Sequence, residues 1–389
     1  MTLPRTCAAL VAAALAVTAA ANPTPAVAER SGPDSYWVYY GCYTGDKGGS
    51  KGITRSKFDV KTGKLSEPEL AADMKSPSFV AIHPNGKFLY AVGEGGGKEG
   101  GPVVAFALDA KTGELKKLNE GMSGGSGPCH VSVHPKGTHA IVANYGGGSC
   151  AIFKLGDDGK IGDRTSFVQH AGSSANPGRQ KEPHAHCGFF TPSGDHAVVA
   201  DLGLDRVKIF KFDSATGKVD DEAATDVATP IGSGPRHIAI APAGDYAYVC
   251  GELDSTVNVV LFDWKAGKPG VIQSLSTLPK PTPGNSTAEC ILSPDGHFVY
   301  VSNRGHNSVA VFKVGEDRKL TAAGHITGDI KIPRNFNIDP SGKWMLIASQ
   351  DGHKIGVFER DLKTGGAKET DVSVKVGLPV CIKFVAVAK

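Results

Sequence analysis

A Pro-x-Gly turn recurs six times along this 389-residue chain and divides it into units of similar length. The six turns are Pro84-Asn85-Gly86, Pro135-Lys136-Gly137, Pro192-Ser193-Gly194, Pro242-Ala243-Gly244, Pro294-Asp295-Gly296 and Pro340-Ser341-Gly342. Their prolines stand 51, 57, 50, 52 and 46 residues apart. A period of this length indicates a repeat architecture, in which each unit is one supersecondary element that packs on its neighbours.

Each turn joins two short apolar runs that are rich in Val, Ile, Phe and Tyr. Residues 79–82 lead into the first turn and residues 88–92 follow it, for example. Such runs, bounded by turn residues, predict β-hairpins. A third apolar run, a Gly-containing turn and a weaker fourth run complete each unit. Four strands in roughly 40–50 residues is the period of a β-propeller blade.

The two ends of the chain supply complementary parts of one further unit. Residues 37–41 resemble only a second strand, and residues 378–384 resemble only a first strand. A blade built from both ends would close the ring and leave no unpaired end blade. We therefore expect an all-β fold, a single seven-bladed β-propeller of four-stranded blades over residues 29–389, whose last blade is closed by both termini. An open solenoid, the alternative, gives no reason to split one repeat between the ends.

The N-terminal segment has the features of an export signal. Arg5 precedes an apolar, Ala-rich run from Ala8 to Ala21, which is too short to span a bilayer. Ala26-Val27-Ala28 fits a small-x-small cleavage site. We expect residues 1–28 to be a cleaved signal peptide and the mature protein to be exported, either periplasmic or secreted, without a membrane anchor. The alternative is an uncleaved N-terminal anchor.

The charge of the chain is nearly balanced, with a formal net charge of +3 and no run of like charges. A nucleic-acid surface would need clustered Lys and Arg, so no nucleic-acid partner is expected. A small molecule is the expected partner, and a monomer is the default state of a closed ring.

The cysteines and histidines do not form a recognisable metal site. Seven cysteines remain after signal cleavage, an odd number that excludes a fully paired framework, and none forms a CxxC pair. Most lie in apolar runs, where Cys behaves as a small buried hydrophobe. His184 and His186 could face the same side of a strand, but no third ligand stands at short spacing. We expect neither a metal ion nor another cofactor.

Ionisable side chains gather where the first strands begin and the second strands end, positions that share one face of a propeller beside its channel. Buried charge is costly unless it is paired or used. Ion pairs between neighbouring blades could account for any single charged residue here, but they leave the surplus of cations unexplained. A surplus of arginines suits an anionic ligand held in bidentate fashion. At this mouth we expect substrate to contact His130, Asn144, Asp201, His237, Glu289, Arg334 and Asn335.

Several motifs at these positions resemble the seven-bladed propeller lactonase family, which includes the propeller-type 6-phosphogluconolactonase and the fungal carboxy-cis,cis-muconate cyclase. The matching stretches cover nearly all of the mature chain and include residues 127–133, 143–148, 183–186, 200–203, 234–237, 252–256, 285–289, 302–306 and 333–336. The resemblance implies a metal-independent enzyme that acts on a lactone at the channel mouth. By motif, its catalytic groups correspond to His184 or His186, Arg236, Glu252 and Arg304.

These observations favour a lactone hydrolase that opens a sugar lactone, which could be phosphorylated. Glu252 would activate water if burial raised its pKa toward neutrality, or a His would take that role. Arg236 and Arg304 would bind the anionic group of the substrate and stabilise the oxyanion. One alternative is a lactonising, cyclase-type lyase acting on a muconate-like acid. Another is a non-catalytic exported propeller, for which apolar or aromatic residues should ring the mouth.

Two further points concern the substrate and the cysteines of the closing blade. The lactonase of the pentose phosphate route is cytosolic, so the export signal leaves the exact lactone open. Cys42 and Cys381 would stand on adjacent strands of the closing blade, where a disulfide could lock the ring; they could equally be reduced core thiols.

Overall fold

The computed structural model describes residues 32–45, 48–97, 99–262, 264 and 268–388. Nearly all of the described residues belong to the unit Pro33–Lys389. The expected signal peptide, residues 1–28, lies outside the described residues. Over the part of the chain that is described, no helix is both long and apolar enough to cross a membrane.

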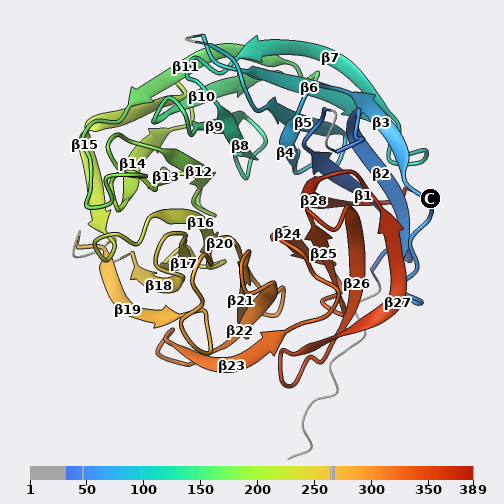
Figure 1. Ribbon diagram of the computed structural model, residues 1–389. Coiled ribbons are helices and arrows are strands. Elements are labelled where there is room, and N and C mark those ends of the chain that lie inside the picture. The colour runs from blue at the N-terminus through green and yellow to red at the C-terminus, as the bar shows by residue number, and fades with distance from the viewer. Residues whose placement is uncertain (1–31, 46–47, 98, 263, 265–267, 389) are drawn as a thin grey trace, which may run out of the picture. The chain divides into compact units, whose positions relative to one another are not determined.

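The unit Pro33–Lys389 is a ring of seven four-stranded antiparallel sheets around a central axis (Figure 1). The described residues form 28 strands and no helix, which confirms the expected all-β propeller. Six of the seven sheets each take four consecutive strands.

Their strands are β4 (Pro77–Ile82), β5 (Phe88–Gly93), β6 (Pro102–Leu108) and β7 (Leu115–Met122); β8 (Pro128–Val133), β9 (His139–Asn144), β10 (Ser149–Leu155) and β11 (Ile161–Gln169); β12 (Ala185–Phe190), β13 (His196–Asp201), β14 (Arg206–Asp213) and β15 (Lys218–Ala228); β16 (Pro235–Ile240), β17 (Tyr246–Gly251), β18 (Thr256–Leu261) and β19 (Gly270–Ser276); β20 (Thr287–Leu292), β21 (Phe298–Asn303), β22 (Ser308–Val314) and β23 (Leu320–Ile326); β24 (Pro333–Ile338), β25 (Trp344–Ser349), β26 (Lys354–Arg360) and β27 (Ala367–Lys375).

The seventh sheet joins the two ends of the chain, as the split repeat predicts. Its order is β28 (Pro379–Ala386), β1 (Ser35–Cys42), β2 (Gly52–Asp59) and β3 (Glu69–Asp73), so the last strand of the chain is its innermost strand. Six antiparallel residue pairs in register, from Tyr36–Ala386 to Gly41–Cys381, hold β1 against β28. The main-chain hydrogen bonds of this sheet therefore connect the N-terminal and C-terminal parts of the propeller.

The disulfide considered between Cys42 and Cys381 is absent, because both are buried free thiols. The register shifts at Cys42, which stands opposite Pro379, while Cys381 stands opposite Gly41. An offset of one residue turns side chains to opposite faces of a sheet. Cys42 accordingly packs in a cluster with Val38, and Cys381 packs in a different one.

The Pro-x-Gly turns lie at the opposite end of the channel from the starts of the first strands, and each requires its glycine. All six turn glycines have a positive φ, between 70° and 81°. In each turn the glycine N–H donates to the carbonyl oxygen three residues earlier, as Gly86 does to His83 (2.8 Å). L-residues with a side chain rarely adopt this conformation, which explains why the sequence repeats glycine here.

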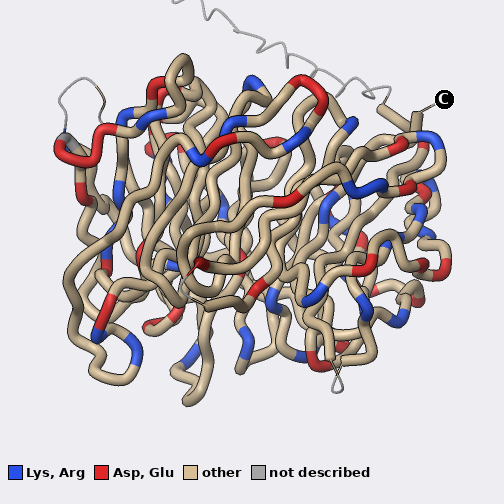
Figure 2. Tube along the Cα trace, turned by 90° about the horizontal axis from the view of Figure 1, so that it is seen from above, with Lys and Arg blue, Asp and Glu red and all other residues tan. Residues whose placement is uncertain are grey.

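Aromatic residues of the second strands join neighbouring blades. The hydroxyl of Tyr39 donates to the Gly113 carbonyl (2.7 Å), and that of Tyr300 donates to the Gly365 carbonyl (2.7 Å). The indole N–H of Trp344 reaches Val60 in the closing blade (2.7 Å). These bonds satisfy the polar ends of buried rings and repeat around the ring, so the blades are fixed relative to one another. Charged residues of both signs are interspersed over the outside (Figure 2).

Candidate functional site

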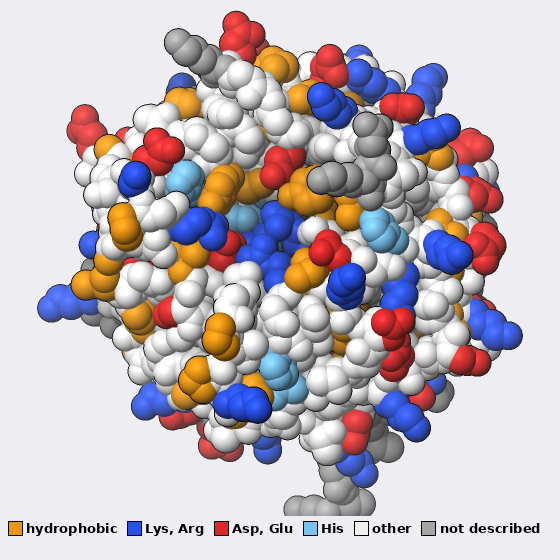
Figure 3. Space-filling view, viewed as in Figure 1, with side chains coloured by type: hydrophobic (Ala, Val, Ile, Leu, Met, Phe, Trp, Pro, Cys, Tyr) orange, Lys and Arg blue, Asp and Glu red, His pale blue; other side chains and the backbone are white. Residues whose placement is uncertain are grey.

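A cavity of about 310 Å³ lies at the mouth where the first strands begin. Figure 3 shows Lys and Arg side chains gathered at the bottom of a hollow in the centre of this face. The volume falls in the range of pockets that hold small ligands. Its lining residues are Glu94, Cys129, Tyr145, Arg179, His186, Glu252, Ser286, Arg304 and Arg334.

The repeat itself places most of these side chains. His186 and Arg334 are each the second residue of an innermost strand, β12 and β24. Glu252 and Arg304 each directly follow a second strand, β17 and β21. The N–H of Glu252 donates to Gly234 (2.8 Å), just before the first strand of its own blade. The same bond recurs at Glu94, Tyr145 and Arg304, so each blade holds its site residue by the same main-chain contact.

Three arginines surround the carboxylate of Glu252. Its Oε1 lies 2.8 Å from Arg179, and its Oε2 lies 2.9 Å from Nε of Arg236 and 3.1 Å from Arg304. The Arg236 contact has the distance of an ion pair but lacks hydrogen-bond alignment, and Nε of both Arg236 and Arg304 is buried with no hydrogen-bond partner among the described residues. The side chains of Arg236 and Glu252 are only 3% and 6% exposed. This is therefore a buried charge cluster with unused donors.

The pKa of Glu252 is lowered, so the condition under which Glu252 could act as the base, a pKa raised toward neutrality, is not met. Burial alone would raise this pKa, but Arg304, Arg236 and Arg179 outweigh burial and hold it at about 2. Burial lowers the pKa of Arg304 to about 10, so this side chain remains charged at neutral pH. Glu252 is thus a permanent anion that positions cations, and it is a weak proton acceptor.

The cavity carries an excess of positive charge. Arg334 lies over the ring of Tyr43 (5.4 Å), whose hydroxyl donates to Glu94 (2.9 Å). Arg179, Arg304 and Arg334 line the cavity together with two carboxylates, Glu94 and Glu252, and Arg236 lies against Glu252 in the adjoining narrow space. The excess of two positive charges in a confined site suits an anionic ligand.

The two candidate histidines have different environments. His186 lines the cavity and is buried. Burial, followed by the charges of Arg236 and other neighbours, lowers its pKa well below 6.5, so it is a neutral imidazole at pH 7. His184 instead stacks on the ring of Tyr145 (4.5 Å, 15°), and its Nδ1 lies 2.9 Å from the Tyr145 carbonyl oxygen. Of the two histidines, only His186 lines the cavity.

Three other residues expected to contact substrate at the mouth form hydrogen bonds to other protein groups and do not line the cavity. Asn144 donates to Ser149 (3.0 Å). Asp201 contacts His170 (2.6 Å) and accepts from the N–H of His184 (2.8 Å). Asn335 bonds both Glu289 and the N–H of Ile382. These three hold loops and blades together and do not line the cavity.

His130, His237 and Glu289 lie deeper in the channel. The imidazoles of His130 and His237 are 5.5 Å apart, and Nδ1 of His237 lies 2.8 Å from Glu289. Burial first, and then neighbouring positive charges, lower the pKa of His130, while burial and Arg236 lower that of His237 against an opposing effect of Glu289. Glu289 lines a different cavity, on the far side of these rings.

Arg179 is a site residue that the repeat pattern does not reveal. It lies in the connection between β11 and β12, outside the four-strand unit. Gln180 anchors this connection through bonds to Leu202 (2.8 Å) and Asp205 (2.7 Å), and Arg179 then reaches Tyr145 (3.0 Å) as well as Glu252. The one available signal was the 57-residue spacing, the longest of the five, which marks an insertion here.

The cysteines and histidines show no sign of nucleophilic or metal chemistry in the part of the chain that the structure describes. Sγ of Cys129 lies 3.9 Å from Nδ1 of His186, but burial raises the pKa of this thiol, so it is held in the unreactive protonated form. No group of three or more His, Cys, Asp or Glu side chains among those described is placed to hold a metal ion.

The sequence model of the family described as "Lactonase, 7-bladed beta-propeller" matches residues 37–384. A 6-phosphogluconolactonase of Bacillus subtilis (strain 168) is 36% identical over 351 residues, which cover 90% of this chain and 98% of that protein. A putative 6-phosphogluconolactonase of Bacteroides fragilis has a solved structure with a TM-score of 0.83 and 33% identity, covering 93% of this chain and all of that one. A periplasmic gluconolactonase of Pseudomonas aeruginosa matches with a TM-score of 0.84 and 29% identity, over 91% of this chain and all of that one.

Proposed function

The chain belongs to the seven-bladed β-propeller lactonase family, and from that premise we propose how its arginine-lined cavity opens a lactone. The protein is a lactone hydrolase of the 6-phosphogluconolactonase type, which its similarity to enzymes of that name supports. The observation that carries the proposed site is the group of three arginines around Glu252, beside a neutral His186. The three relatives described above are named as lactonases, which favours hydrolysis over lactonisation.

In the proposed reaction, Arg236 and Arg304 receive the carbonyl oxygen of the lactone. Their buried Nε–H groups make no aligned hydrogen bond to any residue described, although Nε of Arg236 lies 2.9 Å from Glu252, and they can donate to the oxyanion as it forms. His186 takes a proton from the attacking water while a C–O bond forms at the carbonyl carbon. The C–O bond of the ring then breaks, and the protonated His186 returns the proton to the leaving oxygen. The product is an open-chain hydroxy acid.

Binding of an anionic substrate would also improve His186 as a base. After burial, the largest causes of its lowered pKa include the positive charges of Arg236, Arg334 and Arg304. A substrate anion among these arginines offsets their charge, so the pKa of His186 rises in the complex. A base with a pKa closer to the working pH is a better catalyst.

We place the phosphate of a phosphorylated lactone at Arg179. This side chain is 42% exposed, in contrast to the buried Arg236, so it stands at the entrance. We expect the full chain to hydrolyse both 6-phosphogluconolactone and gluconolactone in a pH-indicator assay. Arg179→Ala should raise KM for the phosphorylated lactone roughly tenfold, the loss expected for a charge-assisted contact, with a much smaller effect on the unphosphorylated one.

Arg179→Lys serves as the control, because it retains the charge and should recover much of the affinity for phosphate. Equal increases in KM for both lactones would contradict the assignment of phosphate to Arg179. Absence of hydrolysis of any sugar lactone would contradict the proposed function itself.

We further propose that the mature protein acts as an exported monomer. The Ala-rich run Ala8–Ala21 and the site Ala26-Val27-Ala28 support export, as does the structural similarity to a periplasmic gluconolactonase. Intact mass of the protein recovered outside the cytoplasm should correspond to a chain that begins at Glu29, and light scattering should give the mass of one chain. A full-length chain found only with the cytoplasm would contradict the proposal.

A further inference from the structure

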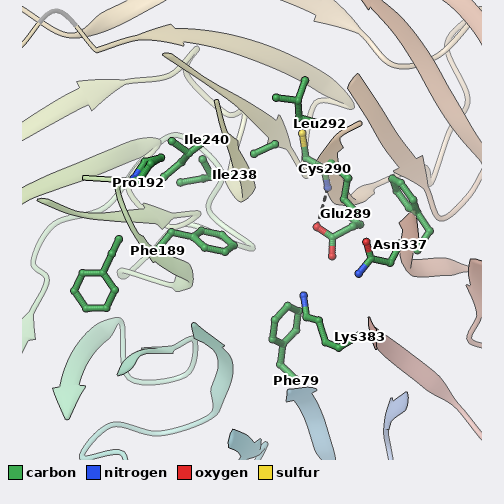
Figure 4. Close-up of a pocket in the computed structure, with 14 residues that line it drawn as sticks. Phe79, Phe189, Pro192, Ile238, Ile240, Glu289, Cys290, Leu292, Asn337 and Lys383 are labelled. Carbon is green, nitrogen blue, oxygen red and sulfur yellow. Dashed lines mark hydrogen bonds between the residues drawn. The ribbon is translucent and has the colours of Figure 1, made fainter. Parts of the chain in front are cut away.

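The central channel contains a second cavity at its other end, among the Pro-x-Gly turns. Its volume is about 380 Å³. Most of its wall is apolar, with Phe79, Phe189, Ile240, Leu292 and Phe336 among the lining residues (Figure 4). The later residues of the innermost strands build it, whereas their first residues build the arginine-lined cavity. The two cavities have no lining residue in common.

A layer of aromatic rings separates the two cavities. His237 stands 5.5 Å from His130 and 5.3 Å from His186, measured between ring centroids. Phe79 closes the layer at 4.3 Å from His130. The space that remains between the cavities is about 10 Å³, enough for about one water molecule. A lactone held by the arginines therefore cannot extend into the second cavity, which must be considered as a site of its own.

Three polar side chains point into this cavity: Glu289, Asn337 and Lys383 (Figure 4). Two of them are already engaged. Glu289 contacts Nδ1 of His237 (2.8 Å), accepts from the N–H of Cys290 (3.0 Å) and bonds the Asn335 amide. Asn337 donates to the Ile382 carbonyl (2.9 Å) and accepts from the N–H of Ile338 (2.9 Å).

Lys383 is the exception. Its side chain makes no hydrogen bond or ion pair within 4 Å to any residue that the structure describes, and its Nζ lies 4.8 Å from the centre of the Phe79 ring. A half-buried ammonium with three unused donors, beside an aromatic wall, is a recognition group for an anion. The apolar wall could not satisfy the hydroxyls of a sugar, because unpaired polar groups are costly to bury.

We propose that this cavity binds an amphipathic carboxylate, in which an aryl group or a short alkyl chain carries one carboxylate. The carboxylate pairs with the Lys383 ammonium, and the apolar part packs against the Phe and aliphatic side chains of the wall. An amine-bearing ligand fits less well, because the oxygens of Glu289 already accept from three donors.

Calorimetric titration of the full chain with 4-phenylbutyrate and with its neutral amide tests both parts of this proposal. The two compounds have the same shape and differ in charge. We expect the acid to bind, and the amide to bind roughly tenfold more weakly, because a hydrogen bond to a charged group is worth that much or more. In Lys383→Met, the affinity for the acid should fall to that of the amide, and the affinity for the amide should stay unchanged.

A second variant and a competitor locate the site. Ile240→Trp should fill the cavity and abolish binding of both compounds while the melting temperature stays near that of the parent. Gluconate, a sugar acid suited to the arginine-lined cavity, should not displace 4-phenylbutyrate. The proposal is overturned if Lys383→Met binds the acid as tightly as the parent does. It is equally overturned if gluconate competes, or if the parent binds neither compound at millimolar concentration.

Discussion

Replacement of Glu252 by Gln is expected to remove nearly all lactone hydrolysis, with a roughly thousandfold lower kcat/KM, and to lower the free energy of unfolding by about 3 kcal/mol. The variant keeps the size of the side chain but leaves Arg236, 3% exposed, and Arg304 without their shared counter-charge. Removal of one partner of a buried ion pair is costly because a buried charge is left uncompensated. The arginines would also lose the anion that orients them, so kcat/KM should fall by roughly a thousandfold, as for loss of oxyanion donors.

The dependence of stability on pH gives an independent readout. The folded pKa of Glu252, about 2, lies below its ordinary value of 4.5, so the carboxylate contributes stability above pH 4.5 and loses it as pH falls toward 2. The difference in unfolding free energy between parent and variant should therefore shrink over that window. Denaturant titrations at several pH values measure it.

Asp339→Asn is the matched control, because it should lower the stability of the protein while it leaves the charge cluster around Glu252 intact. Asp339 is also fully buried, but it accepts from the N–H groups of Trp344 (2.7 Å) and Ser341 (3.0 Å) in a Pro-x-Gly turn at the other end of the channel. This variant should be less stable and remain active when folded. If Glu252→Gln kept a tenth of the parental activity, the proposed role of the charge cluster would be wrong.

His186→Gln is expected to lower kcat by roughly a hundredfold to ten-thousandfold, the usual contribution of a general base. The comparison with His184→Gln is decisive, because the two histidines are two residues apart and only His186 lines the cavity. We expect His184→Gln to lose at most about tenfold, through the displaced Tyr145 ring that it stacks on. Equal losses in the two variants would contradict the assignment.

The pH dependence of the parent's lactonase activity should report the ionisation of His186. A base works when unprotonated, so activity is lost as pH falls through its pKa. Burial and the neighbouring positive charges lower the pKa of His186, so the acid limb of kcat/KM should lie below pH 6.5. The limb of kcat, which reports the complex, should lie at higher pH because the bound anion offsets the arginines. This shift of the kcat limb is expected with the phosphorylated lactone; with the unphosphorylated lactone, which carries no charge, the limbs of kcat and kcat/KM should coincide. An acid limb near pH 2 would instead identify Glu252 as the base.

The fold could be predicted from the sequence because its information is local and repeated. Six Pro-x-Gly turns, whose glycines all need a positive φ, mark the hairpins, and the incomplete units at the two ends specify closure through β28 and β1. The face of the ring that carries the arginine-lined cavity was also predictable, because the second strands end and the first strands begin at that face. Glu252, Arg304 and Arg334 lie there for that reason.

Local patterns could not decide two features of the site and one of the closing blade. Arg179 comes from an insertion without a repeat to align it, and it reaches Glu252 across 73 residues of sequence. The lowered pKa of Glu252 results from arginines on three separate segments of the chain, so its direction depends on distances rather than on motifs. The free state of Cys42 and Cys381 depends on which face of the closing blade each side chain takes.

The sequence by itself determined the number of blades, the closure by both termini and the set of charged residues near the channel. Only the tertiary structure decided which of them meet. The physical reason lies at the start of every innermost strand, where all seven sheets show a register shift. A bulge breaks the two-residue alternation of a strand, so alternation cannot tell which side chain points where. Only the folded structure therefore shows that His186 lines the arginine-lined cavity while His184 stacks on Tyr145. It likewise shows that Glu289 lines the apolar cavity on the other side of the aromatic layer.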